Sequence, residues 1–127
     1  LDGLKNTTYE GVVRGEEKKD LLSWGNIFAL PTYYKMEGQP ISILEAMATG
    51  NVIVTTAHAG IPDVITDGEQ GFFVQKHDAE DLYNCFEKLS SDLEKLSQIG
   101  TANVNYFQAN FTKLKFRDRL LKIIQNV

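Results

Sequence analysis

Two glutamates separated by seven residues, Glu37 and Glu45, flank the start of a predicted helix at residues 40–49. Side chains of that segment are apolar over most of a helical wheel, interrupted by Ser42 and Glu45. A helix that is apolar nearly all round is a buried helix, so we expect Glu45 to be a poorly solvated carboxylate. Such a group needs hydrogen-bond donors, because burial without a partner is costly or shifts its pKa until it is neutral.

The start of the same helix is a second chemical feature. Pro40 suits the first helical position, and Gln39 before it is a poor N-cap. The N–H groups of residues 41–43 therefore have no obvious side-chain cap. Gly38 allows close approach to the backbone. An uncapped helix start that follows a strand is a ready anion site, so these residues indicate a phosphorylated ligand.

Alternating strands and helices are expected to position these groups. Strands are predicted at residues 7–13, 26–30, 51–55 and 71–74, and helices at 16–24, 40–49, 79–89, 92–108 and 112–125, with a helical turn at 61–65. Gly50 ends the second helix, and Asp78 caps the third with Asp81 placed for reciprocal capping.

This alternation predicts the α/β class: a Rossmann-like, doubly wound parallel sheet followed by C-terminal helices. Ligands of such sheets bind at the carboxyl ends of the strands. The loops there are expected at residues 13–16, 31–39 and 56–60.

Composition narrows the function classes. At 127 residues the chain is one domain at most, and a net charge of −4 argues against nucleic acid as a partner. No apolar run reaches the length of a membrane span, and no signal peptide is visible. The single cysteine, Cys85, fits a reducing cytoplasm and, on the apolar side of a predicted helix, is expected to be a buried, inert thiol. No cluster has metal-ligand spacing, so we expect neither a protein-bound metal nor a cofactor.

The segment EGQPISILEAMATG also carries a family resemblance, together with FALPTYY before it and VIVTTAHAGIPDVITDGEQGFFV after it. It resembles the C-terminal, donor-binding domain of retaining GT-B glycosyltransferases of the E-x7-E type (glycosyl transferases group 1, family four). Sucrose synthases and bacterial capsule and lipopolysaccharide glycosyltransferases typify that family. The match covers residues 7–89.

The resemblance implies a role for each matching residue. Glu45 would accept hydrogen bonds from the ribose hydroxyls of a nucleotide, and Glu37 would be the catalytic glutamate that faces the donor sugar. The other donor-binding positions that it implies are Gly38, Gln39, Ile41, Ser42, Val13 and Lys18. The backbone of the first four would contact sugar hydroxyls and the diphosphate, Val13 would meet the nucleobase, and Lys18 would lie near the nucleotide.

The function implied is transfer of a sugar, with retention, from a nucleotide-diphosphate donor to an acceptor hydroxyl. A UDP-sugar is the favoured donor. The acceptor, a sugar or a lipid-linked molecule, would bind a separate N-terminal domain, in a cytoplasmic enzyme or one peripheral to the inner membrane. The alternatives are a GT-B-type nucleotide-sugar epimerase and a non-catalytic module that binds an anion or a nucleotide, because fold alone does not separate these.

The chain departs from the family pattern in ways that carry consequences. Ala59-Gly60 replaces the usual Gly-Gly, and the loop at residues 31–37 is a residue or two longer. The first two strands of the family's domain, with the arginine and lysine that clamp the diphosphate, are not in this chain, and Arg14 is not at an equivalent position. We therefore expect this fragment to be inactive alone, and to self-associate or rearrange its N-terminal segment, because unpaired strand edges invite association.

Several side chains keep a simpler interpretation. Glu45 could be a structural carboxylate bonded to a neighbouring loop, and Glu37 an ordinary glutamate of a surface loop. Tyr33 and Tyr34 line an acceptor cleft in one interpretation and pack at the edge of the domain in the other. His58 is either an exposed loop histidine or a functional one, because its loop follows the third predicted strand, at the end of the sheet where the cleft is expected.

Overall fold

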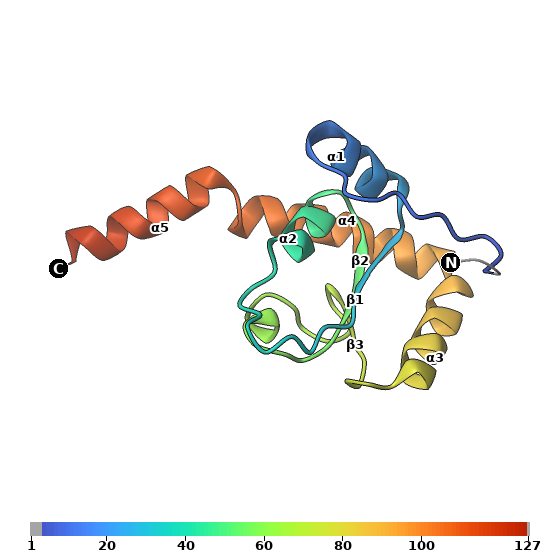
Figure 1. Ribbon diagram of the computed structural model, residues 1–127. Helices are drawn as coiled ribbons and strands as arrows, with labels where there is room; N and C mark the ends of the chain where they lie inside the picture. Colours follow the sequence, from blue (N-terminus) through green and yellow to red (C-terminus); the bar gives the residue numbers. More distant parts are fainter. Residues whose placement is uncertain (1–3, 127) are drawn as a thin grey trace.

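The computed structural model describes residues 4–126 of the chain (Figure 1). The elements are α1 (Gly15–Trp24), β1 (Ile27–Leu30), α2 (Ile41–Ala48), β2 (Val52–Thr55), the short 3-10 helix η1 (Ile61–Asp63), β3 (Gly71–Phe73), α3 (Ala79–Ser90), α4 (Leu93–Asn110) and α5 (Lys113–Gln125). Strands and helices alternate as far as α3, and two further helices follow. Apart from the first predicted strand, each predicted element is present, with bounds that differ by two residues at most.

The three strands form one parallel sheet in the order β1-β2-β3. The central strand, β2, is buried along its whole length. An apolar, β-branched strand is typical of a parallel sheet that is covered on both faces. The predicted α/β, Rossmann-like class with C-terminal helices is confirmed.

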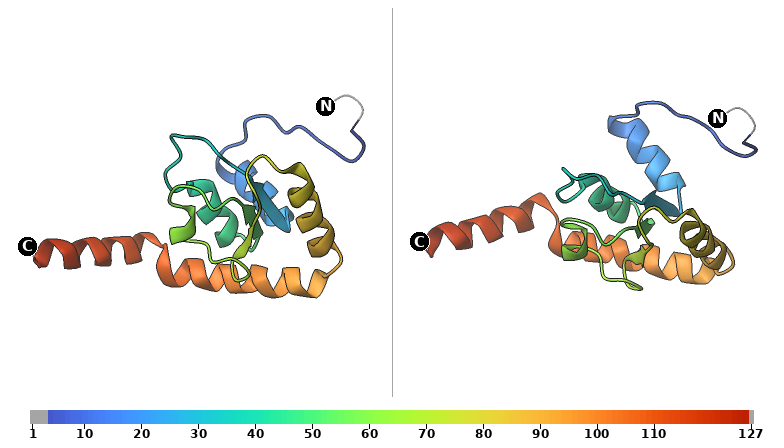
Figure 2. Two further views of the ribbon diagram at one scale, coloured as in Figure 1. Left: turned by 90° about the horizontal axis from the view of Figure 1, so that it is seen from below. Right: turned by 60° about the horizontal axis from the view of Figure 1, so that its bottom comes forward.

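Helices cover both faces of this sheet. Successive side chains of β2 point to opposite faces and therefore pack against different helices. Ile53 packs into one buried cluster with Ile43 and Met47 of α2, and with η1. Val52 and Val54 belong to a second cluster, which α3 and α4 complete. Figure 2 shows α4 running along the molecule beside the sheet, and α5 leading away from it.

Two close backbone contacts require glycine. A Cβ built on Gly71 of β3 would lie 1.9 Å from the carbonyl oxygen of Ile53, and one built on Gly100 of α4 would lie 2.3 Å from the oxygen of Gly50. Gly50 itself has φ +83° and follows the C-cap of α2, as predicted for a helix-ending glycine. These contacts hold α4 and β3 against the α2–β2 unit.

The predicted strand at residues 7–13 is wrong. That segment is irregular, and its apolar side chains are largely exposed, including Tyr9 at 77% and Val12 at 82%. Strand preference mostly reflects packing against neighbouring strands, and this segment pairs with no strand of residues 4–126. Gly11 in its middle has φ +69°, which a regular strand does not have.

A smaller correction concerns the start of α3. The Asp78 carboxylate accepts the Asp81 N–H at 2.9 Å, as predicted for an N-cap. The Asp81 carboxylate, however, accepts the Gln75 N–H at 2.7 Å instead of reaching back to Asp78. Aspartate is one methylene shorter than the glutamate of a capping box, so its reach differs from that of the residue the motif requires.

Candidate functional site

The N-terminus of α2 lies at the carboxyl end of the sheet, between the loop that follows β1 and the loop that follows β2. Pro40 is the N-cap residue, not the first helical residue as predicted, and no side chain of residues 4–126 caps the helix. The Ile43 N–H was predicted to lack a partner, but it donates to the Pro40 carbonyl at 3.1 Å. Two N–H groups, those of Ile41 and Ser42, have no acceptor within the described part of the chain. They are the donors that an anion would meet.

Glu37 lies in the loop between β1 and α2, and local hydrogen bonds fix its position. Its N–H donates to the Tyr34 carbonyl at 3.0 Å, and its Oε2 accepts the Thr32 hydroxyl at 3.4 Å. The side chain is half-buried. Next to it, no described atom lies within 4 Å of a Cβ built on Gly38, so the backbone there faces open space. A ligand could approach both residues.

Glu45 lies on α2 facing α1, and it forms an ion pair with Lys18. The Lys18 Nζ donates to the Glu45 Oε1 at 2.6 Å, and the two side chains are 41% and 36% exposed. The expected deep burial of Glu45 is therefore wrong. Ser42, Glu45 and Thr49 form a polar stripe along α2 that faces away from the core, whereas Ile43, Ala46 and Met47 enter it.

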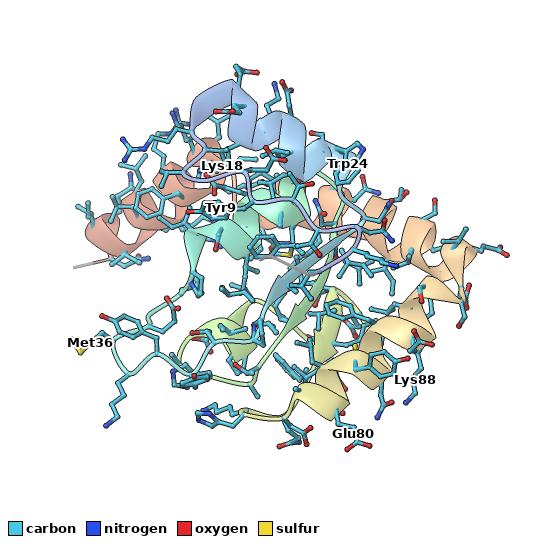
Figure 3. The ribbon with its side chains drawn as sticks, turned by 45° about the vertical axis from the view of Figure 1, so that its right-hand side comes forward. Tyr9, Lys18, Trp24, Met36, Glu80 and Lys88 are labelled. Carbon is cyan, nitrogen blue, oxygen red and sulfur yellow. The ribbon has the colours of Figure 1, made fainter. Side chains whose placement is uncertain are left out.

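The ion pair lies in a cleft between α1 and α2. Its volume is about 470 Å³, and its lining residues are Gly15, Glu16, Lys18, Lys19, Leu22, Glu45, Ala48 and Thr49. Figure 3 shows Lys18 on α1 beside α2. At this exposure a surface ion pair contributes about 0–1 kcal/mol to stability. The pair therefore matters more for the charge of the cleft, because the ammonium offsets the carboxylate that would otherwise repel an anion.

The remaining predicted residues border this region without sharing one cavity. Val13 is half-buried in the irregular segment just before α1. Gln39 is exposed between Gly38 and the N-cap. Glu37 is not among the described residues that line the cleft. The predicted residues thus lie on two sides of the α2 N-terminus: Glu37, Gly38 and Gln39 on one side, and Lys18 and Glu45 on the other.

Three loops at the carboxyl end of the sheet are joined through His58, a connection that sequence reasoning left open. Its Nε2 is 2.8 Å from the Tyr34 carbonyl oxygen, in the loop after β1. Its Nδ1 is 2.8 Å from the Nζ of Lys76, after β3. Alongside, the rings of Tyr33 and His77 lie 3.9 Å apart. The position of His58 after a central strand was the only sequence signal for this cluster.

The amino end of the strands also has a depression, of about 530 Å³, between α1, α2 and α4. Its described lining residues are apolar or neutral, with no ionisable side chain, so it offers little chemistry. Cys85 of α3 is partly buried, and burial raises the pKa of its thiol, with a further contribution from Asp81. The expected inert thiol is consistent with that direction, because the thiolate is the reactive form.

Within residues 4–126 no three His, Cys, Asp or Glu side chains are grouped in a way that could hold a metal ion. None of the helices in the described part of the chain has the length and apolar character that crossing a membrane requires.

Comparison with known sequences shows what this chain is similar to. The family model described as "Glycosyl transferases group 1" matches residues 1–92. A protein of Salmonella typhimurium described as a colanic acid biosynthesis glycosyltransferase, WcaL, is 30% identical over 122 residues, which is 92% of this chain and 30% of that protein. Sucrose synthase of Beta vulgaris is 28% identical over 115 residues, covering 88% of this chain and 15% of the enzyme. The chain thus spans less than a third of either relative.

Solved structures show the same fold. HepE of Anabaena, in complex with UDP, matches with a TM-score of 0.78 and 18% identity, over 84% of this chain and 29% of that structure. Sucrose-phosphate synthase of Thermosynechococcus elongatus matches with a TM-score of 0.74 and 24% identity, over 84% of this chain and 26% of the enzyme.

Proposed function

The chain belongs to the glycosyl transferases group 1 family and has the fold of GT-B glycosyltransferases, and from this premise we propose that it binds a nucleotide-diphosphate sugar at the N-terminus of α2. In a longer protein it would serve transfer of that sugar to an acceptor hydroxyl with retention of configuration. UDP-sugars are the favoured donors, and HepE, which shares the fold, forms complexes with UDP and with UDP-glucose.

The observation that carries this proposal is the open end of α2 with one glutamate on each side. The N–H groups of Ile41 and Ser42 are directed away from the helix and have no acceptor among residues 4–126. The positive end of a helix attracts phosphate through such groups and through its dipole. These groups support binding of the diphosphate at the two amides, and we propose that the sugar lies next to the open backbone at Gly38.

The Lys18–Glu45 pair suits the nucleoside part of such a donor. The ammonium occupies Oε1 of the carboxylate, which leaves Oε2 available to the ribose hydroxyls. Hydrogen bonds to a charged acceptor are the strong ones, so a carboxylate is an effective partner for a diol. Lys18 then orients Glu45 rather than contacting the phosphates, and the nucleobase is proposed to meet the backbone of Val13, which lies just before α1.

Glu37 is proposed to face the donor sugar on the other side of the helix terminus. A carboxylate there stabilises the positive charge that develops on the sugar as the bond to the diphosphate breaks, and the helix terminus stabilises the departing diphosphate. Catalysis in this scheme depends on positioning and on electrostatic stabilisation. Inactivity of the 127-residue chain alone, a separate acceptor-binding domain, self-association and a cytoplasmic or membrane-peripheral location are further parts of the proposal.

Titration of the ¹⁵N-labelled chain with UDP and UDP-glucose tests whether a nucleotide sugar binds at the N-terminus of α2. We expect amide shifts at Ile41 and Ser42, and an affinity for UDP-glucose about tenfold lower in Glu45→Gln, because a charged hydrogen-bond acceptor is lost. Glu87→Gln is the matched control, since this glutamate is exposed on α3. Absence of shifts at α2 with both ligands would overturn the proposal.

The same titration distinguishes nucleotide-sugar binding from the main alternative, a module that binds only an anion. A module that only binds anions would respond to inorganic diphosphate as strongly as to UDP-glucose, and Glu45→Gln would leave its affinity unchanged. The open helix terminus would serve such a module equally well. The Lys18–Glu45 cleft is the observation that favours a nucleotide sugar over a simple anion.

A further inference from the structure

The loop that carries Glu37 has few apolar anchors. It runs from Pro31 to Gln39, and its side chains Tyr34 and Met36 are 63% and 80% exposed. Figure 3 shows Met36 at its outer tip, away from the sheet. A segment with so little buried apolar surface opens easily, so its conformation depends on the hydrogen bonds that reach it from other elements.

His58 supplies one of those bonds from the loop after β2. Its Nε2 lies 2.8 Å from the Tyr34 carbonyl oxygen. The same oxygen accepts the Glu37 N–H at 3.0 Å. One carbonyl group therefore separates the His58 ring from the backbone of Glu37, and displacement of Tyr34 moves Glu37.

Lys76 determines which tautomer of His58 can form this bond. Its Nζ lies 2.8 Å from the His58 Nδ1. A lysine ammonium has donors and no acceptor, so Nδ1 must be the unprotonated nitrogen. The ring proton is then on Nε2, where it is donated to the Tyr34 carbonyl. Lys76 thus selects the neutral tautomer that is able to hold the loop.

Two further bonds bring the same two loops together. The Gly60 N–H donates to the Gly38 carbonyl at 3.0 Å, and the Thr56 hydroxyl donates to the Thr32 carbonyl. Ala59, which lies between Thr56 and Gly60, has φ +51°. This left-handed backbone conformation is unfavourable in free energy for a residue that has a Cβ. The loop after β2 is thus held in a strained shape that brings His58 and Gly60 against the Glu37 loop.

We propose that His58 is a positioning residue for Glu37: its Nε2–H, selected by Lys76, holds the Tyr34 carbonyl and so the Glu37 loop across the carboxyl end of the sheet. The inference rests on the proposed function only in taking Glu37 as the group that faces the donor sugar. His58 itself touches no reacting atom in this scheme. It acts through Tyr34.

Amide hydrogen exchange of the 127-residue chain tests the position of the loop without any ligand. In His58→Phe, which keeps a ring and loses the donor, the Glu37 amide should exchange about tenfold faster, the factor that one hydrogen bond of ordinary strength represents. In His58→Gln, which keeps an N–H donor, exchange should stay within about twofold of the parent chain. The Val52 amide, bonded to the Asn26 carbonyl at the other end of the sheet, is the internal control.

Two results of that experiment would overturn the proposal. One is unchanged exchange at Glu37 in His58→Phe. The other is equal loss of protection at Glu37 and Val52, which would indicate general destabilisation. Long-range ¹H–¹⁵N spectra of the imidazole supply an independent signature: the proton should reside on Nε2, and Lys76→Met should mix the two tautomers. A dominant Nδ1–H form in the parent chain would also contradict it.

Ligand affinity then connects His58 to the sugar. The ratio of the affinity for UDP-glucose to that for UDP reports contacts with the sugar, and we expect His58→Phe to lower this ratio and His58→Gln to retain it. An unchanged ratio in His58→Phe would refute the connection to the sugar. If the parent chain bound neither ligand, the proposed function would fail, whereas the exchange and tautomer results would still decide whether His58 positions the loop.

Discussion

The two ends of α2 differ in how their backbone groups are satisfied. At the N-terminal end no side chain within residues 4–126 caps the helix, and Ile41 is 71% exposed. At the C-terminal end, the Thr49 hydroxyl donates to the carbonyls of Glu45 and Ala46, and the buried Asn51 amide donates to Ala46 as well. The Asn51 amide also donates to the Leu22 carbonyl at 2.7 Å, so these bonds connect the C-terminal end of α2 to α1 and to the start of β2.

The difference shows how a short helix can serve stability and ligand binding separately. Eight residues of α-helix are about 12 Å long, so the two tasks are separated by little more than two turns. Buried hydrogen bonds and glycine contacts fix the C-terminal end against α4. At the N-terminal end two N–H donors have no acceptor among residues 4–126, and these are the groups proposed to bind the anion. Substitutions at the two ends should therefore affect different measurements.

The largest contrast is expected between two glycines. In Gly100→Ala the new Cβ would lie 2.3 Å from the Gly50 oxygen, whereas in Gly38→Ala it would meet no described atom within 4 Å. We expect Gly100→Ala to lower the free energy of unfolding by about 3 kcal/mol or more, and Gly38→Ala to change it by less than about 0.5 kcal/mol. Urea unfolding measures both, and Gly38→Ala should instead weaken UDP-glucose binding. Equal loss of stability in the two variants would remove the distinction between the two ends.

A buried side chain of α4, that of Asn103, tests how the C-terminal end of α2 and the strand after it are held. It is 1% exposed, and its Nδ2 donates to the carbonyls of Asn51 at 2.7 Å and Gln70 at 2.8 Å. Asn103→Ala leaves a cavity and unpaired buried carbonyls, so we expect a loss of about 2–3 kcal/mol in the free energy of unfolding. Asn105→Ala, at an exposed position on the same helix, is the control and should be neutral within about 0.5 kcal/mol. A neutral Asn103→Ala would show that α4 is not held by this amide.

The structure at the C-terminal end of α2 could be predicted from the sequence better than the contacts around its N-terminal half. Gly50 as the helix-ending residue and the buried strand after it follow from local rules, because both depend on residues adjacent in the chain. The Lys18–Glu45 pair joins residues 27 positions apart, and the His58–Tyr34 contact joins residues 24 apart. Such contacts depend on how helices and loops pack, which periodicity does not encode.

The segment at residues 7–13 also shows that local sequence patterns do not encode packing, because it was predicted to be a strand and is irregular. Its threonines, tyrosine and valines favour a strand, but strand formation also depends on packing against a neighbouring strand, and the segment makes no such pairing within residues 4–126. Likewise, the apolar circumference of α2 predicted a buried Glu45, because a wheel does not reveal that one narrow stripe faces a cleft. Local sequence rules gave the elements, whereas the exposure of a charged side chain depended on the packing between two of them.

Lys18 and Lys19 of α1 offer a test of the cleft at nearly constant stability. Lys18 pairs with Glu45, whereas Lys19 pairs with the exposed Glu16 at 3.1 Å. We expect Lys18→Met and Lys19→Met each to change the free energy of unfolding by less than about 1 kcal/mol, because exposed ion pairs contribute little. UDP-glucose affinity, measured by calorimetry, should fall in Lys18→Met and fall less in Lys19→Met, because Lys19 lines the same cleft but pairs with Glu16 instead of Glu45. Tighter binding by Lys18→Met would mean instead that the ammonium competes with the ligand for Glu45.

The smallest expected effect on stability tests the open end of α2 directly. Ile41→Glu places a negative charge at the first helical residue, where it interacts favourably with the free N–H groups and the helix dipole. Compared with the neutral Ile41→Gln, it should raise the free energy of unfolding by about 0.3–1 kcal/mol. The same charge occupies the place proposed for the diphosphate, so UDP should bind Ile41→Glu more weakly than Ile41→Gln, and added salt should reduce the difference. Uridine, which lacks phosphate, should bind the two variants equally. Equal UDP affinity of the two variants would place the phosphates away from this helix end, even if the gain in stability were observed.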